Sequence, residues 1–247
     1  MERMYERNWG FIPEDLQEKI ETTKLLFVGC GAASQIALLA ARAGFTKFIL
    51  LDGDKVTLSN LNRQAFFSHQ LGQNKAQVLK ELILGINPNA KVTAYPEFLV
   101  DAERVAKEVK KADIILNSAD PEEPLWTIHY FCRKEQKVEI QILNMGWLAY
   151  AIVFTPQTPS LEEIVGGKVY GVDLYMRLAT ATMRFLPKKF IDFLSRYSKK
   201  IERRPFPQLG PTVLANAAQV VTAMIRIVMG DPTLPVAPKA LTIDLFP

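Results

Sequence analysis

Asn60, Arg63 and Lys75 follow one another closely in the sequence, shortly after the acidic residue Asp52. Arg63 can bind two phosphate oxygens at once, and Lys75 can act as a point charge. Fixed donors of this kind stabilise the charge that develops when a nucleophile attacks the α-phosphorus of ATP and pyrophosphate leaves. A hydride-transfer enzyme has no need of them here. The set indicates ATP chemistry, although each charge taken singly is also typical of a solvated surface.

A glycine-containing turn precedes this set. Gly29 and Gly31 follow the apolar run 25–28, and Asp52 comes about 20 residues later, where a carboxylate commonly holds ribose hydroxyls. Glycines let the backbone approach a phosphate, and the following helix offers free N–H groups. Ser34 replaces the third glycine of the dinucleotide fingerprint. The turn favours nucleotide binding over a merely tight turn, and it does not distinguish NAD from ATP.

Asp120 comes just after another apolar run, 113–116. Carboxylate oxygens are the ligands that Mg²⁺ prefers, so Asp120 is a candidate for binding the metal of a Mg·ATP complex. Its structural alternative is to cap the helix that follows.

To act together, these residues must lie at the same edge of a sheet, which parallel strands would achieve. Apolar runs predict strands at 25–28, 47–51, 92–98, 113–116, 138–143, 149–154 and 241–245, and helical patterns lie at 33–43, 74–86, 102–112, 122–135 and 211–229. This alternation predicts an α/β fold with a doubly wound, mainly parallel, Rossmann-like sheet and helices on both faces. We expect residues 1–155 to form the nucleotide-binding core with an N-terminal arm. Residues 156–247 are expected to add a crossover loop, a helical extension and a closing strand on the same domain.

Composition narrows the class of protein. The 247 residues carry a formal charge of +4 and are 49% hydrophobic, which excludes disordered, collagen-like and coiled-coil chains. No secretory signal opens the chain, and the apolar window 25–41 is interrupted by glycine and polar residues, so we expect a cytoplasmic protein with no membrane contact. Acidic residues dilute the basic stretch 188–204, so nucleic acid is not an expected partner.

Together the motifs resemble a known family, the ThiF/MoeB/HesA branch of the ubiquitin-activating enzyme superfamily. The resemblance is dense to about residue 144 and looser beyond. The motifs that carry it are Gly29-x-Gly31, Asp52-x-Asp54, Ser59-Asn60-Leu61-Asn62-Arg63-Gln64, Gly72-x-x-Lys75, Ile86-Asn87-Pro88 and Ser118-Ala119-Asp120. The resemblance implies an adenylyltransferase that uses ATP and Mg²⁺.

The resemblance also implies a role for each matching residue. Gly29 and Gly31 would line the ATP site, Asp52 would hold the ribose, and Asp120 would bind the catalytic Mg²⁺. The triphosphate would be contacted by Asn60, Arg63, Gln64 and Lys75. Tyr5-Glu6-Arg7-Asn8 resembles the family's N-terminal arginine motif, so Arg7 would reach the phosphates of the neighbouring subunit in a homodimer.

The chain departs from the family in its cysteines. Many members carry two Cys-x-x-Cys pairs for zinc, and some have a cysteine nucleophile in the crossover loop. Here only Cys30 and Cys132 occur, so we expect no zinc and no thioester on the enzyme. We interpret both as buried thiols and His69 and His129 as structural residues. Trp147, which follows a predicted strand end, is a candidate for bordering an acyl-substrate groove.

We therefore expect Mg·ATP-dependent adenylation of a carboxylate, giving acyl-AMP and pyrophosphate, with the acyl group taken up by a separate acceptor protein or second substrate. The carboxylate would be the C-terminal glycine of a ubiquitin-like sulfur carrier or a small molecule of cofactor biosynthesis, and the sequence does not rank the two. An NAD-dependent Rossmann oxidoreductase and a non-catalytic nucleotide-binding protein remain the alternatives.

Overall fold

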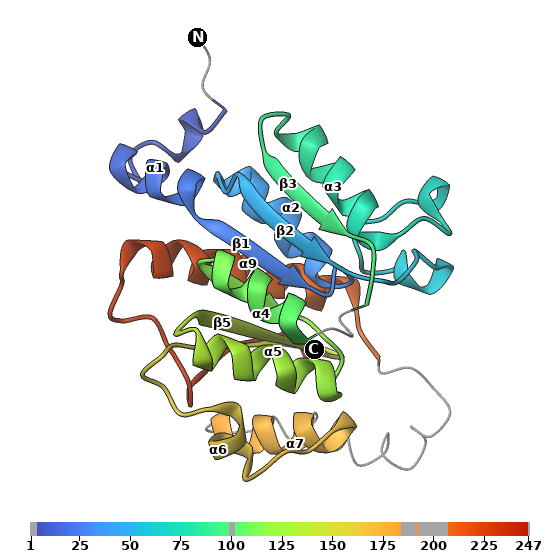
Figure 1. Ribbon diagram of the computed structural model, residues 1–247, viewed down its shortest axis with the longest axis vertical. Coiled ribbons are helices and arrows are strands. Elements are labelled where there is room, and N and C mark those ends of the chain that lie inside the picture. The colour runs from blue at the N-terminus through green and yellow to red at the C-terminus, as the bar shows by residue number, and fades with distance from the viewer. Residues whose placement is uncertain (1–3, 99–101, 184–191, 193–206, 247) are drawn as a thin grey trace.

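The computed structural model of the chain describes residues 4–98, 102–183, 192 and 207–246. Within this part of the chain, one sheet of seven strands has the order β3-β2-β1-β4-β5-β6-β7 (Figure 1). The strands are β1 (Lys24–Val28), β2 (Lys47–Leu51), β3 (Lys91–Tyr95), β4 (Ile114–Asn117), β5 (Val138–Met145), β6 (Leu148–Phe154) and β7 (Ala240–Asp244). The first five are parallel, whereas β6 runs antiparallel to both β5 and β7. The predicted α/β class with a mainly parallel sheet is confirmed.

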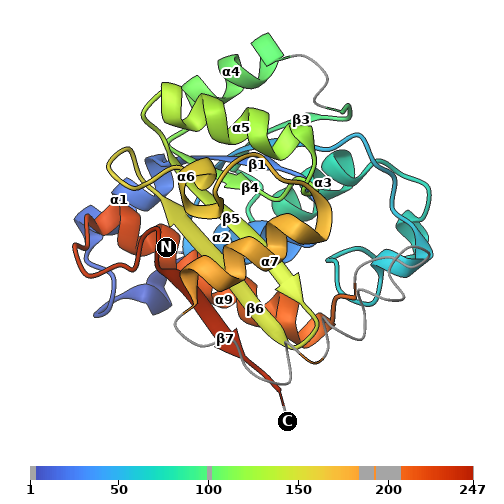
Figure 2. The same cartoon turned by 90° about the horizontal axis from the view of Figure 1, so that it is seen from below.

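Helices cover both faces of the sheet. One face carries α1 (Glu14–Thr22), α2 (Ala33–Ala43), α3 (Lys75–Ile86) and α9 (Gly210–Met229), and the other carries α4 (Ala102–Lys111) and α5 (Glu123–Lys134). Two further helices, α6 (Leu161–Val165) and α7 (Gly171–Thr182), pack beside β5 and β6 (Figure 2). In β1, Leu25 and Phe27 face α2 and α9 while Leu26 and Val28 face α4 and α5. Burial on both faces explains why this strand is a continuous apolar run.

Local signals fix several helix ends. The Asn74 side chain accepts a hydrogen bond from the N–H of Gln77 at the start of α3. Gly44 and Gly230 adopt left-handed conformations after α2 and α9. The segment 156–167, predicted as a crossover loop, contains α6, which the reciprocal Ser160–Glu163 capping box begins. The helix α1 was also missed by the sequence prediction.

The helix α9 is long and apolar enough, by length and composition, to match a membrane span. Its buried residues instead face the core cluster between α2 and the sheet, among them Ala217, Val220 and Met224. Its packing therefore accounts for its apolar composition. Apart from Asp192, the basic stretch 188–204 lies outside the described residues.

Candidate active site

Three strands bring the predicted residues to one edge of the sheet. Gly29 follows the end of β1, Asp52 follows β2, and Asp120 comes shortly after β4. Because β1 pairs in parallel with β2 on one side and with β4 on the other, the strand order reverses at β1. Ligands of open parallel sheets bind outside the carboxyl ends of the strands at such a reversal.

The glycine turn approaches the end of β4 very closely. Gly29 has φ +82°, and a Cβ atom on it would lie 2.6 Å from the carbonyl oxygen of Ser118. Only glycine fits this contact without displacing the backbone. The helix α2 begins directly afterwards, and its N-cap residue, Ala32, has no side chain that could cap it. Apart from the N–H of Ser34, which donates to the carbonyl oxygen of Gly31, the N–H groups at the start of this helix have no side-chain cap and are available for an anion.

Asp52 is oriented by backbone donors. Its two carboxylate oxygens accept hydrogen bonds from the N–H of Cys30 at 2.6 Å and from that of Asp54 at 2.8 Å. Burial raises the pKa of Asp52, and the two N–H donors and the charge of Lys75 oppose this rise without cancelling it. Each oxygen keeps a second lone pair, so the carboxylate can still accept a hydrogen bond from a ribose hydroxyl.

Lys75 is buried beside this carboxylate, as the first residue of α3. Its Nζ lies 2.8 Å from Oδ2 of Asp54, and its N–H donates to the carbonyl oxygen of the same residue. Asn74 connects the start of α3 to the end of β2, because its amide donates to the carbonyl oxygens of Asp52 and Asp54. Lys75 is thus held next to Asp52, with Asp54 as its counter-ion.

The guanidinium of Arg63 is held by neutral acceptors. Nη1 donates to the carbonyl oxygen of Ser59 and to Oδ1 of Asn62, both at 2.8 Å, and Nε donates to Oε1 of Gln208 at 2.7 Å. Partial burial lowers the pKa of Arg63, but an arginine remains charged in proteins. Among the described residues no carboxylate pairs with Arg63, so its charge is available to an anionic ligand.

Asn60 and Gln64 are buried beneath this loop. Oδ1 of Asn60 accepts a hydrogen bond from the N–H of Thr57 and so closes the short 3₁₀-helix η2 (Leu58–Asn60). Gln64 packs against the glycine turn, since a Cβ atom on Gly31 would lie 3.0 Å from its Nε2. Oε1 of Gln64 is buried and, within the described chain, has no hydrogen-bond partner. Contact of these two amides with phosphates stays a prediction.

Asp120 is exposed at the same edge. The N-cap of α5 is Glu122, so Asp120 does not serve as the cap of that helix. No group of three or more His, Cys, Asp or Glu side chains arranged to hold a metal occurs in the described residues. A single carboxylate fits Mg²⁺ that arrives with a nucleotide, because phosphate oxygens and water complete its octahedral shell.

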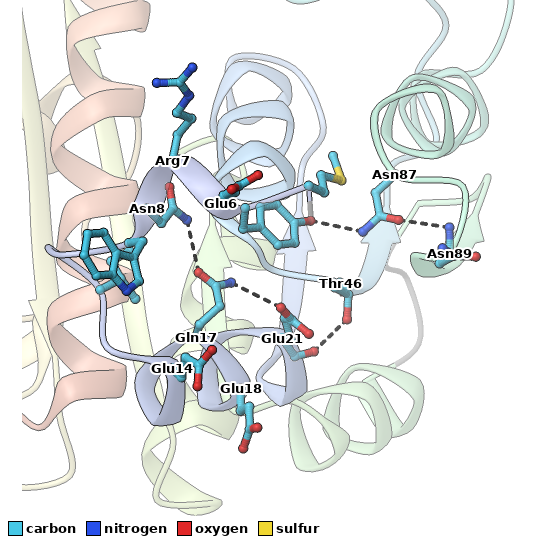
Figure 3. Close-up of a pocket in the computed structure, with 14 residues that line it drawn as sticks. Glu6, Arg7, Asn8, Glu14, Gln17, Glu18, Glu21, Thr46, Asn87 and Asn89 are labelled. Carbon is cyan, nitrogen blue, oxygen red and sulfur yellow. Dashed lines mark hydrogen bonds between the residues drawn. The ribbon is translucent and has the colours of Figure 1, made fainter. Parts of the chain in front are cut away.

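Arg7 lies at the opposite edge of the sheet. Neighbouring Tyr5 donates to the carbonyl oxygen of Ala41 near the end of α2 and accepts a hydrogen bond from Asn87 after α3, and these helices end at the amino edge of the strands. Arg7 borders a hollow of about 1450 Å³ there, and Figure 3 shows its side chain pointing away from the glutamates on α1. Within one chain the fold does not bring Arg7 to the other candidate residues.

Two polar residues of the site make contacts that the sequence motifs did not predict. Ser34, which replaces a glycine of the fingerprint, donates to the carbonyl oxygen of Gly31 and accepts from the N–H of Ala65. It therefore joins the glycine turn to the loop of residues 57–65, called the Arg63 loop below. Gln208 contacts Arg63 from 145 positions away and carries no local signal. Trp147, which was predicted to border an acyl-substrate groove, lies at the turn between β5 and β6, and 39% of its surface is exposed. Its contact with a substrate stays a prediction.

Comparisons with known proteins agree with this fold. The model of the ThiF family matches residues 5–247. The chain is 33% identical over 141 residues to a probable molybdopterin-synthase adenylyltransferase of Gracilaria tenuistipitata var. liui, which covers 56% of this chain and 39% of that protein. It is 32% identical over 163 residues to ubiquitin-like modifier-activating enzyme 5 of Gallus gallus, and this alignment covers 61% of this chain and 39% of that protein.

The alignments thus span about two fifths of the length of these curated relatives. A crystal structure of E. coli MccB with ATP superposes with a TM-score of 0.72 at 20% identity, covering 99% of this chain and 72% of that one. A structure of PaaA superposes with a TM-score of 0.70, also at 20% identity, covering 93% and 63%. The fold is shared along nearly the whole chain, and the chain belongs to the ThiF family.

Proposed function

We propose that this protein catalyses the Mg²⁺-dependent adenylation of a substrate carboxylate by ATP. The observation that carries the proposal is Arg63, a cation held by neutral acceptors at the edge where Asp52 and Asp120 also lie. In the reaction, a carboxylate oxygen attacks the α-phosphorus, the bond from that phosphorus to the bridging oxygen breaks, and pyrophosphate leaves. The names of the curated relatives, an adenylyltransferase and a modifier-activating enzyme, support the same reaction class.

In this proposal the chain orients its substrates and neutralises their charge. Asp52 accepts hydrogen bonds from the ribose, and the first turn of α2 donates to a phosphate. Arg63 and Lys75, with Asn60 and Gln64, stabilise the charge on the transferred phosphorus and on the leaving pyrophosphate. Asp120 would bind Mg²⁺, which supplies further charge neutralisation at the phosphates.

The cysteines support a reaction that stops at the adenylate. Cys30 and Cys132 are both fully buried, and burial raises the pKa of both thiols well above their ordinary value. The thiolate is the nucleophilic form, so neither side chain is suited to take up the acyl group. The acceptor is then a separate protein or a second substrate.

Two classes of carboxylate suit this proposal. One is the C-terminal glycine of a ubiquitin-like carrier, which fits the names of the curated relatives. The other is a small acid or a peptide, and the related MccB structures include one with MccA.

ATP–pyrophosphate exchange tests both, with a carrier ending in Gly-Gly compared with a panel of small acids. Silence with every substrate, while Mg·ATP still binds, would indicate a binding protein. Selective thermal stabilisation by NAD would indicate the oxidoreductase.

Asp120→Asn is expected to lower exchange about a hundredfold and to raise the Mg²⁺ concentration needed for half-maximal rate, because a charged metal ligand is lost. Exchange rates across a Mg²⁺ titration provide the measurement. Glu122→Gln is the matched control, since Glu122 is also exposed and lies two residues away. Equal rates in Asp120→Asn and wild type would remove the metal role from Asp120.

A homodimer is part of the proposal, since Arg7 can join the site only from a second subunit. Arg7→Ala and Arg63→Ala are each expected to be inactive. When both variants are mixed and their subunits exchange, mixed dimers contain one intact site, so activity should return to about a quarter of wild type. Exchange assays before and after mixing measure this recovery. No recovery, despite mixed dimers detected by mass spectrometry, would contradict the role of Arg7 in trans.

A further inference from the structure

The segment 207–209, which leads into α9, lies against the Arg63 loop. Oε1 of Gln208 accepts the Nε hydrogen bond of Arg63 at 2.7 Å, and the carbonyl oxygen of Gln208 accepts a longer bond of 3.4 Å from Nδ2 of Asn62. The approach continues at Gly210, where a Cβ atom would lie 2.8 Å from the carbonyl oxygen of Asn62. Both the side chain and the backbone of Gln208 are therefore fitted to this loop.

The same segment is held on its other side by the turn between β5 and β6. The N–H of Gly146 donates to the carbonyl oxygen of Pro207 at 3.1 Å, and Gly146 forms an isolated parallel bridge with Gln208. The hydroxyl of Thr212, in the first turn of α9, donates to the carbonyl oxygen of Gly146 at 2.6 Å. Gln208 is thus fixed between the Arg63 loop and the turn that carries Trp147.

Gln208 is an uncharged hydrogen-bond acceptor, which suits a cation whose charge must remain available to a ligand. A guanidinium has five N–H donors in a planar fork, and fixing Nε fixes the direction of the whole plane. Gln208 does this as a neutral acceptor. Among the described residues, Nη2 of Arg63 has no protein partner, so one corner of the fork remains available. A carboxylate at the same place would pair with Arg63 and compete with an anionic ligand.

We infer that Gln208 is a positioning residue that orients the guanidinium of Arg63 toward a triphosphate while leaving its charge uncompensated. The inference rests on the proposed function, because it assigns Arg63 to the phosphates of ATP. It adds a residue from the far end of the chain to the binding machinery. It also makes the orientation of Arg63 depend on the β5–β6 turn.

A double-mutant cycle tests whether Gln208 acts through Arg63. Affinity for Mg·ATP is measured by calorimetry for wild type, Arg63→Ala, Gln208→Leu and the double variant. Loss of a hydrogen bond to a charged group is expected to weaken binding about tenfold in Gln208→Leu. In the Arg63→Ala background the same change should have no further effect, because the side chain that it orients is gone.

Two more variants sharpen the test. Gln219→Leu is the matched control, since Gln219 lies on α9, is partly buried and donates one hydrogen bond to Asn216. It should bind Mg·ATP like wild type. Gln208→Glu keeps an acceptor but compensates the charge, so it is expected to weaken binding by at least as much as Gln208→Leu. Thermal unfolding of each variant verifies that the fold is retained.

The outcomes separate this inference from the proposed function. A wild-type protein that does not bind Mg·ATP overturns both. Binding by wild type with equal losses from Gln208→Leu in the two backgrounds, or with no loss at all, overturns only the role of Gln208. Wild-type affinity in Gln208→Glu would show that charge compensation at this position is harmless, and it would overturn the neutral-acceptor argument.

Discussion

Arg63→Ala is expected to lower ATP–pyrophosphate exchange about a thousandfold while leaving the fold intact. The guanidinium is the cation of the site with no carboxylate partner among the described residues, so its full charge is available to the pyrophosphate that leaves in the proposed reaction. Arg63 is only partly buried and is held by polar acceptors, so its removal uncovers those acceptors and opens no cavity in the apolar core. The measurements are the exchange rate at saturating Mg·ATP and the midpoint of thermal unfolding.

Two variants make the Arg63 result specific. Arg226→Ala removes an arginine from the far end of α9, where it pairs with Asp231, and should leave the exchange rate unchanged. Arg63→Lys keeps the charge but loses the planar fork, so its activity should fall between those of wild type and Arg63→Ala. If the chain is instead a non-catalytic nucleotide-binding protein, Arg63→Ala should leave its function unchanged.

The strands were predictable because burial on both faces makes each central strand a continuous apolar run. Leu25 to Val28 and Lys47 to Leu51 match the observed β1 and β2 closely, since a glycine or an aspartate ends each run. The helices α2 and α9 end at left-handed glycines that were visible in the sequence. These elements are set by local chemistry, which a single sequence displays.

The elements that the sequence did not reveal are short or polar. The helix α1 has only Leu16 and Ile20 buried, too few to produce a clear apolar period. The helix α6 has five residues, and its one signal was the Ser160–Glu163 capping box between proline-rich and glycine-rich segments. The reversal of direction at β6 follows from a turn at Gly146, whose positive φ a sequence pattern does not specify.

In the candidate site, too, the features set by local sequence were predictable and those set by distant contacts were not. Asp52, Arg63 and Lys75 lie close in sequence and follow motif spacing, so their common edge could be predicted. The partners that hold them could not, because Gln208 contacts Arg63 from 145 positions away. The buried carboxylate Glu139 is a further example, since its partners come from three different elements and no motif surrounds it.

That carboxylate is the centre of a buried hydrogen-bond network. Oε1 of Glu139 accepts from the side-chain amides of Asn117 at 2.7 Å and of Gln141 at 2.9 Å, and Oε2 lies 2.5 Å from Nδ1 of His129. Nε2 of His129 accepts the N–H of Leu161 at the start of α6, so the proton of the neutral ring is on Nδ1 and is donated to Glu139. The network joins β4, β5, α5 and α6.

Glu139→Ala is expected to lower the free energy of unfolding by about 3–5 kcal/mol, because it leaves three buried donors without their acceptor. Glu139→Gln keeps the shape but presents an N–H₂ group to donors, so a loss of about 1–3 kcal/mol is expected. Urea unfolding measures both, and Glu81→Ala, an exposed glutamate on α3, is the control. A loss in Glu139→Ala no larger than in the control would mean that burying the carboxylate costs as much as its hydrogen bonds return.

Acid provides an independent test of the same network. Burial by itself raises the pKa of Glu139, but the hydrogen bonds that its carboxylate accepts from His129, Asn117 and Gln141 favour the charged form, and the pKa lies below its ordinary value of 4.5. A carboxyl group with a lowered pKa stabilises the fold above its ordinary pKa, and this contribution is lost as the pH falls through the folded-state value. Wild type should therefore lose stability below pH 4.5 more steeply than Glu139→Gln. Since Asn117 ends the strand that leads to Asp120, Glu139→Gln should also require more Mg²⁺ for exchange at neutral pH, which a purely local effect on stability would not produce.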